Sequence, residues 1–294
     1  IGEGGKFQAT ASGVLPNGKS VIVNSDGTVS VVALENVTQA AGSRTAFNST
    51  HTNWTSSAFD SSNNKIVIAY RNQDDLEHGY AVVGTVSGTT VSFGTPVKFN
   101  AGNSEYNSIV YDTSAQKVVI CYTDASNSDY GTAIVGTVSG TSISFGTEVV
   151  FRSNTTRSID AVYDSTNNAV VITYKDGLNF GKAIVGTTSG TSISFGSEAT
   201  YQGSRVDEPS AAFDSTNNKV VIMWSDDGNG NLLTGIVGTV SGTSISFGTK
   251  VASSLETDEG FSGTDTTFDS GNGKIVVVSQ SQASPDKPTA LVAT

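Results

Sequence analysis

An aromatic ring and a carboxylate recur together at one position of a repeated segment, and this pairing is typical of sugar recognition. A ring stacks on the C–H face of a sugar, while a carboxylate accepts hydrogen bonds from its hydroxyls. Three of the four rings precede an aspartate by two residues. With the charged residues around them, the candidate binding residues are Tyr70, Arg71, Asp74, Tyr122, Asp124, Tyr174, Lys175, Asp176, Trp224 and Asp226. The structural alternative is that the rings fill gaps between sheets and the aspartates stabilise turns.

The remaining residues that could do chemistry do not form a catalytic or metal-binding pattern. His51, His78 and Cys121 give no zinc motif. The segment 227–231 resembles the start of a calcium loop but lacks the required glycine and the closing glutamate. Adjacent carboxylates such as Asp207-Glu208 could serve a glycosidase, but no nucleophile elbow or phosphate loop is present. We therefore expect a protein that is not an enzyme and has no metal or cofactor.

Two phrases repeat along the chain with a period of about 50 residues, which is typical of propeller blades. The first phrase is GTVSGTSISFG or a close variant, and its copies start at Gly84, Gly136, Gly186 and Gly238. The second is an aromatic-Asp pair followed by a polar turn and an apolar run. Its copies are Phe59-Asp60, Tyr111-Asp112, Tyr163-Asp164, Phe213-Asp214 and Phe268-Asp269.

One repeat reads as four strands. Residues 53–59 form a short inner strand that includes Trp54, and residues 65–70 form a second strand whose continuous apolar run predicts burial on both faces. Residues 79–86 form a third strand, and a Ser-Gly turn leads into an outer strand over 90–99. The outer strand contains a proline, which is tolerated best at a sheet edge.

These units predict an all-β chain, a six-bladed β-propeller of four-stranded antiparallel blades in one domain, 1–294. The last unit stops after its third strand, and residues 5–10 supply a spare strand, so the N-terminal strand is expected to complete the last blade and close the ring. A solenoid or open array is the alternative. The expected blades are roughly 10–50, 51–101, 102–153, 154–203, 204–253, and 254–294 plus 1–9.

Comparison of the repeats separates a uniform face from a variable one. The DSTNN-type and SGT turns are nearly identical between units and fall on the same face. The loops 71–78, 123–130, 175–180 and 225–231 differ between units, as do the inter-blade segments 100–107, 153–159, 203–209 and 254–261. All of these lie on the opposite face. This pattern predicts a binding surface on the variable face, with neutral drift of loops as the alternative.

Bulk properties exclude several functions. The net charge is −11, and an acidic chain without basic runs is a poor partner for nucleic acid or anionic lipid. No apolar stretch is long enough for membrane insertion. Cys121 has no second cysteine to pair with, and its apolar surroundings predict an inert buried thiol. Because the first residue is Ile1, the loss of a leader or of further domains stays open.

The phrase over residues 11–30 and the GTVSGTSISFG repeats resemble repeat proteins of marine tailed phages, of the cyanophage and pelagiphage type. The resemblance implies a tail-fibre or other virion protein, at the virion surface or extracellular. Its partners would be a host-surface glycan or protein and other virion proteins. No site residue carries over from the resemblance. A purely structural or self-assembling subunit is the alternative, and a glycan-active enzyme is a third reading.

Overall fold

The structure is a computed structural model, and the chain forms two compact units, residues 1–43 and 44–294. The residues that it describes are 10–11, 13–14, 21–24, 26, 28–31, 41–257, 263–281 and 287–293. In the first unit, β1 (Val21–Val23) and β2 (Val29–Val31) form an antiparallel pair. No helix among the described residues is long and apolar enough to cross a membrane.

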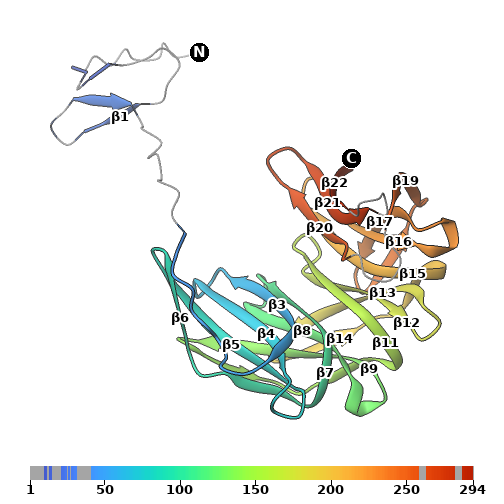
Figure 1. Cartoon of the computed structure of the whole chain (residues 1–294). Helices are drawn as coiled ribbons and strands as arrows, with labels where there is room; N and C mark the ends of the chain where they lie inside the picture. The colour runs from blue at the N-terminus through green and yellow to red at the C-terminus, as the bar shows by residue number, and fades with distance from the viewer. Residues whose placement is uncertain are drawn as a thin grey trace. The chain divides into compact units, whose positions relative to one another are not determined.

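The second unit begins with a four-stranded antiparallel sheet (Figure 1). Its inner strand β3 (Thr52–Asp60) pairs with β4 (Lys65–Asn72), which pairs with β5 (His78–Ser87). The short strand β6 (Thr90–Phe93) and the first half of β7 (Val97–Asp112) both pair with β5, so together they form the fourth strand. The second half of β7 crosses over to become the inner strand of the next sheet.

This arrangement is repeated in three further sheets, and a three-stranded sheet follows them. The three sheets contain β8 (Lys117–Asp124), β9 (Tyr130–Ser139), β10 (Ser142–Phe145), β11 (Val149–Asp164), β12 (Ala169–Asp176), β13 (Phe180–Ser189), β14 (Ser192–Phe195), β15 (Ala199–Asp214), β16 (Lys219–Asp226), β17 (Leu232–Ser241), β18 (Ser244–Phe247) and β19 (Val251–Glu256). The last sheet contains β20 (Asp265–Asp269), β21 (Lys274–Ser281) and β22 (Lys287–Ala293). Short 3-10 helices, η1 (Ala125–Asn127) and η2 (Asp227–Asn229), lie in two of the loops.

The inner strands of consecutive sheets lie side by side, because β3 contacts β7, β7 contacts β11, β11 contacts β15 and β15 contacts β20. The prediction of an all-β chain of antiparallel sheets is confirmed, and the strands fall where the repeats place them. The six-bladed count and the closed ring stay predictions. They depend on residues 1–43, and residues 1–9 lie outside the described part of the chain.

Aromatic side chains pack across the contacts between consecutive sheets, up to the fourth sheet. Phe99, at the end of the fourth strand of the first sheet, lies 5.2 Å from Tyr122 and 6.0 Å from Phe145 of the second sheet, between ring centroids. The same three-ring contact joins the following sheets, and Phe47 makes it with the first sheet. The other sets are Phe47 with Tyr70 and Phe93, Phe151 with Tyr174 and Phe195, and Tyr201 with Trp224 and Phe247.

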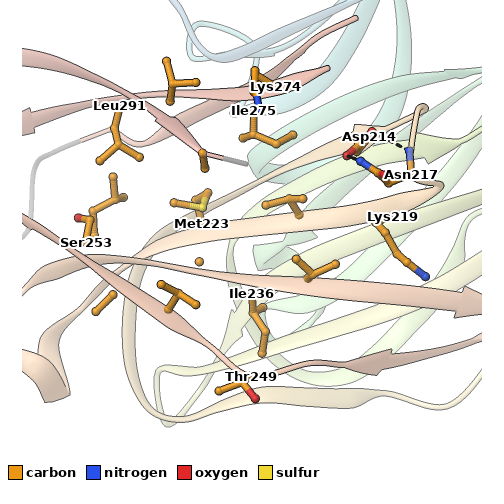
Figure 2. A pocket seen from close by; sticks show the side chains of 18 of the residues that line it. Asp214, Asn217, Lys219, Met223, Ile236, Thr249, Ser253, Lys274, Ile275 and Leu291 are labelled. Carbon is orange, nitrogen blue, oxygen red and sulfur yellow. Dashed lines mark hydrogen bonds between the residues drawn. The ribbon is translucent and has the colours of Figure 1, made fainter. Parts of the chain in front are cut away.

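The three-ring contact is missing between the fourth sheet and the last one. Ser253 occupies the repeat position of Tyr201, and Ser279 occupies that of Trp224. A cavity of about 590 Å³ lies here, with Met223 and Leu233 on one side and Ile275 and Leu291 on the other. Figure 2 shows Ser253 at the edge of this largely apolar space.

The uniform face consists of the predicted turns. In the first sheet, Asp60 accepts hydrogen bonds from the backbone N–H groups of Ser62 and Asn63, both at 3.0 Å, and from Nδ2 of Asn63 at 2.8 Å. An aspartate that bonds its own turn in this way offers the backbone a local partner. The aspartates that repeat the backbone contacts are Asp112, Asp164, Asp214 and Asp269.

The glycine after each SISF segment packs against the next sheet. A Cβ atom on Gly146 would overlap the backbone carbonyl oxygen of Thr191 in the following sheet, and Gly94 and Gly196 are equally crowded. Gly248 differs, because within the described residues no turn of the last sheet lies against it, and the nearest atom to a Cβ placed there is the carbonyl oxygen of Val237, 3.7 Å away. We expect Gly146→Ala to lower the free energy of unfolding by about 1–3 kcal/mol through overpacking.

The matched control is Gly248→Ala. It changes the equivalent glycine of another copy of the repeat, at a position where the added Cβ atom has room. Denaturant unfolding of the two variants checks the prediction. An equal loss in both would mean that the glycine serves the backbone and not the sheet-to-sheet contact.

Candidate functional site

The four repeated rings do not form a sugar-binding surface, which corrects the first prediction. Tyr70 is 1% exposed, and Tyr122, Tyr174 and Trp224 are fully buried. Each lies in the contact between two sheets, where the incoming aromatic covers it. The hydroxyls of Tyr122 and Tyr174 donate to Glu148 and Glu198, at 2.8 and 2.6 Å. The structural alternative is therefore correct for these residues.

The aspartates that follow the rings also have structural contacts. Asp124 accepts from the backbone N–H of Ser126 and caps η1, at 3.1 Å. Asp176 accepts from the backbone N–H groups of Leu178 and Phe180, both at 2.9 Å. The Oδ2 atom of Asp226 accepts from Nζ of Lys250, at 2.9 Å. All three are buried, so their carboxylates do not point to a ligand.

The remaining predicted residues divide into two sheet-to-sheet links and one exposed acid. Nη1 of Arg71 donates to Glu105 at 3.1 Å, and Nζ of Lys175 donates to Asp207 at 3.0 Å. Each pair joins the second strand of one sheet to the inner strand of the next. Asp74 accepts from the backbone N–H of His51 at 3.1 Å and stays exposed. The structure does not bring the ten predicted residues together in one site.

A different set of residues gathers where the inner strands begin. In the first four sheets, the pairing of the inner strand with the second strand has a β-bulge, which lies between Asn53 and Ser56 in β3. The equivalent bulges lie in β7, β11 and β15. One residue of each bulge has a positive φ although it is not glycine: Trp54 (49°), Tyr106 (51°), Ser158 (47°) and Glu208 (43°). Such a conformation costs about 1–3 kcal/mol and is found at functional sites.

These bulges surround a pocket of about 240 Å³, here called the inner-strand pocket. Its lining comes from β3, β7, β11 and β15 and from the start of β20, and consists of Trp54, Thr55, Tyr106, Asn107, Ser158, Ile159, Asp160, Glu208, Pro209, Ser210, Thr264 and Asp265. Trp54 is 37% exposed, and its ring centroid lies 4.2 Å from that of Tyr106 at an interplanar angle of 45°. The pocket therefore has an accessible aromatic wall.

The charged side chains of the pocket lining are all carboxylates. Glu208 accepts from the hydroxyl of Ser158 at 3.4 Å, and Asp265 is exposed. Burial raises the pKa of the Tyr106 hydroxyl, and the negative charges of Glu105 and Glu208 add to this shift. Among the described residues, no group of three His, Cys, Asp or Glu side chains could hold a metal ion.

Asp160 positions the strands around the pocket. Its Oδ1 accepts from the Ser108 hydroxyl at 3.2 Å and from its neighbour's N–H, while its Oδ2 accepts from the Ser210 hydroxyl at 3.3 Å and from the Ala211 N–H at 2.8 Å. It thereby ties three inner strands together. Burial raises the pKa of the Asp160 carboxyl, and the hydrogen bonds act against that shift. Ser56 and Ser108 make the simpler versions of this link in earlier sheets.

The pocket also holds polar atoms without a partner. Asn107 is 7% exposed, and its Nδ2 makes no hydrogen bond within the described residues. The hydroxyl of Thr264 is equally unpaired there. A buried polar group without a partner costs free energy, and because both atoms are shielded from solvent, neither is reached from the pocket.

The prediction of a variable face agrees with the position of this pocket. Tyr106, Ser158 and Glu208 lie in the inter-blade segments that differ between units, although none of them was among the ten candidates. One signal in the sequence could have identified them. Trp54 and the three residues at the same position of later units differ in chemistry, although the aromatic-Asp phrase that follows each of them repeats. That this face binds a ligand stays a prediction.

No protein-family model and no curated protein sequence matches the chain. Solved structures do. The SapL1 lectin in complex with α-methyl fucoside has a TM-score of 0.52 at 14% identity, over 83% of this chain and 76% of that one. A triple arginine-to-alanine mutant of AofleA from Arthrobotrys oligospora has a TM-score of 0.57 at 9% identity, over 91% and 73%. Trypanosoma rangeli sialidase has a TM-score of 0.51 at 14% identity, over 95% and 52%.

These similarities concern the fold. The chain resembles β-propeller lectins and sialidases in architecture. It spans about half the length of the sialidase. Because all the identities are low, no site residue is transferred from these proteins.

The buried rings lead to a stability prediction. We expect Tyr174→Ala and Trp224→Ala each to lower the free energy of unfolding by about 3–5 kcal/mol, because each removes a large side chain from a packed contact. Trp54→Ala, which truncates an exposed ring, should cost no more than about 1 kcal/mol. Denaturant unfolding of the three variants measures the difference. Comparable losses in all three would show that Trp54 belongs to the core and not to an accessible wall.

Proposed function

We propose that this chain is a non-enzymatic glycan-binding β-propeller that holds its ligand in the inner-strand pocket of the variable face. The observation that carries the proposal is the accessible Trp54, which packs against Tyr106 in a pocket that is also lined by carboxylates. A ring provides the stacking surface for a sugar, and the polar groups bond its hydroxyls. The fold, shared with lectins, is consistent with this role.

Binding without catalysis is favoured by the state of the buried carboxylate. A glycosidase needs one carboxyl group that delivers a proton and a second that acts as nucleophile or base. Asp160, which is the most enclosed acid of the pocket, has both oxygens occupied by hydrogen bonds from three inner strands. It holds the pocket together and has no free lone pair aimed at a substrate. The proposal therefore assigns the carboxylates to recognition.

The setting that the repeat phrases predict is a virion or extracellular surface, with a host-surface glycan as the ligand and other virion proteins as neighbours. The similar solved structures are lectins and glycosidases and give no support for a phage protein. The virion role therefore rests on the repeat phrases alone. A purely structural subunit that assembles through its uniform face is the competing proposal.

We also propose the closed six-bladed ring, with residues 5–10 as the fourth strand of the last sheet. Three observations support it. Within the described residues, the outer edge of β22 has no pairing strand. In the described part of the chain, no turn covers Gly248 as turns cover Gly94, Gly146 and Gly196. The cavity of about 590 Å³ next to Ser253 lies where complete sheets place a third ring.

Glycan binding can be tested on a glycan array with the whole chain. We expect saturable binding that Trp54→Ala reduces at least tenfold, because stacking on a ring contributes on the order of 1 kcal/mol or more. Phe59→Ala is the matched control, since Phe59 is an exposed aromatic on the same strand at its opposite end, 55% exposed. Loss of binding in both variants, or no binding by the folded chain, would support the structural role instead.

Ring closure predicts that residues 1–10 stabilise the second unit. Deletion of these residues should lower the thermal unfolding midpoint by several degrees, since an unpaired edge and an unfilled cavity remain. Phe7→Ala should reproduce much of this loss if the ring fills the cavity, whereas Lys6→Ala should not. An unchanged midpoint in the deletion variant would contradict closure by this segment.

A further inference from the structure

The inner-strand pocket has a negative wall that no cation of its lining balances. Glu208 and Asp265 contribute carboxylates, and the lining contains no lysine, arginine or histidine. Neither has an ion-pair partner among the described residues. The charge of the pocket therefore favours some glycans over others. This inference rests on the proposed function.

The basic side chains on the inner strands and beside them pair with acids outside the pocket lining. Arg157 pairs with Asp129 at 3.5 Å, while Arg205 and Lys175 both pair with Asp207, at 3.1 and 3.0 Å. The charge of Arg157 still acts on Tyr106, where it opposes the effect of Glu105 and Glu208 on the pKa of the hydroxyl, so it offsets part of the negative charge. A sialylated, sulfated or phosphorylated sugar would enter a field of its own sign, which the net charge of −11 strengthens.

The carboxylates are not arranged for a metal ion either, because the described residues contain no group of three acidic or other ligating side chains close enough to hold one. The opposite wall is aromatic. The face of a tryptophan or tyrosine attracts an organic cation within about 6 Å. A ligand that carries its positive charge on a carbon framework fits both walls.

The neutral part of the lining adds a second requirement. Thr55 is exposed at the pocket, and its hydroxyl can donate or accept a hydrogen bond. A simple amine or a free cation leaves this hydroxyl to water, whereas a sugar with an amine group bonds it together with the charged wall.

We infer that the inner-strand pocket binds an amino sugar whose nitrogen is protonated and not acetylated. The sugar ring lies against Trp54 and Tyr106, and the ammonium group faces Glu208 and Asp265. One of its hydroxyls bonds the hydroxyl of Thr55. Discrimination against the acetylated sugar arises because acetylation removes the charge and leaves the carboxylates unpaired.

Isothermal titration calorimetry with two matched probes tests the inference. The probes are the tetramer of glucosamine and the tetramer of N-acetylglucosamine, titrated into the whole chain at about pH 5.5, above the ordinary pKa values of carboxyl groups. We expect the amine tetramer to bind at least tenfold more tightly, since hydrogen bonds to charged groups contribute more than neutral ones. Added salt should weaken the binding of the amine tetramer and leave the acetylated one nearly unchanged.

Variants connect the preference to this pocket. Glu208→Gln should remove most of the difference between the probes, and Asp265→Asn provides a second variant on an exposed side chain if the first lowers the unfolding midpoint. Asp74→Asn is the control, because it removes one carboxylate from the same face outside the pocket. Its preference should equal that of the unmodified chain.

The outcomes separate this inference from the proposed function. Equal affinity for the two probes, preference for the acetylated one, or a preference that survives Glu208→Gln and Asp265→Asn overturns the inference. If a neutral glycan binds and Trp54→Ala abolishes that binding, the proposed function still stands. If no glycan binds the folded chain, both fail.

Discussion

The structure depends on an aromatic side chain that reaches across the contact between one sheet and the next. Phe99, Phe151 and Tyr201 lie in the fourth strands of the first three sheets and insert beside the ring of the next second strand, and Phe47, which precedes β3, lies in the same way beside Tyr70 of the first sheet. Sheets with two apolar faces cannot stand alone in water, so this insertion determines how the first four sheets stack. A long strand such as β7 carries the ring in the half that pairs within its own sheet and then continues as the inner strand of the next sheet.

In this stack, the turn face and the opposite face of the sheets differ in what holds them together. The turn face is held by aspartates that bond their own backbone and by glycines that allow the next turn to approach. Its residues repeat because each copy meets the same neighbour. At the other end the inner strands start beside one another, tied by Ser56, Ser108 and Asp160. The side chains beyond these ties line the pocket, and they differ between units.

The strands and their order could be predicted from the sequence, because repeated apolar runs and turn phrases report burial and backbone geometry directly. The site residues could not. Tyr174 and Trp224 were chosen because a ring recurs beside a carboxylate, but recurrence at one position of a stacked repeat reflects a repeated contact. A ring that fills a gap and a ring that stacks on a sugar have the same sequence signature. The bulges that place Trp54 and Tyr106 at the pocket have no local sequence motif. They are shifts in the register between an inner strand and its second strand, near the start of the inner strand.

The backbone at those bulges gives the clearest separation of scaffold from site. A positive φ is least costly for glycine and is tolerated by asparagine. The chain uses glycine for it in one set of repeated turns, at Gly88, Gly140, Gly190 and Gly242, and in the other set it uses Asn64, Asn168 and Asn218, with Gln116 in one copy. At the bulges the same backbone conformation is occupied instead by a tryptophan, a tyrosine, a serine and a glutamate. Strand pairing does not require these side chains, and glycine would relieve the strain. Their retention at the lining of one pocket, with four different chemistries at one repeat position, is what a binding site built on a repetitive scaffold requires.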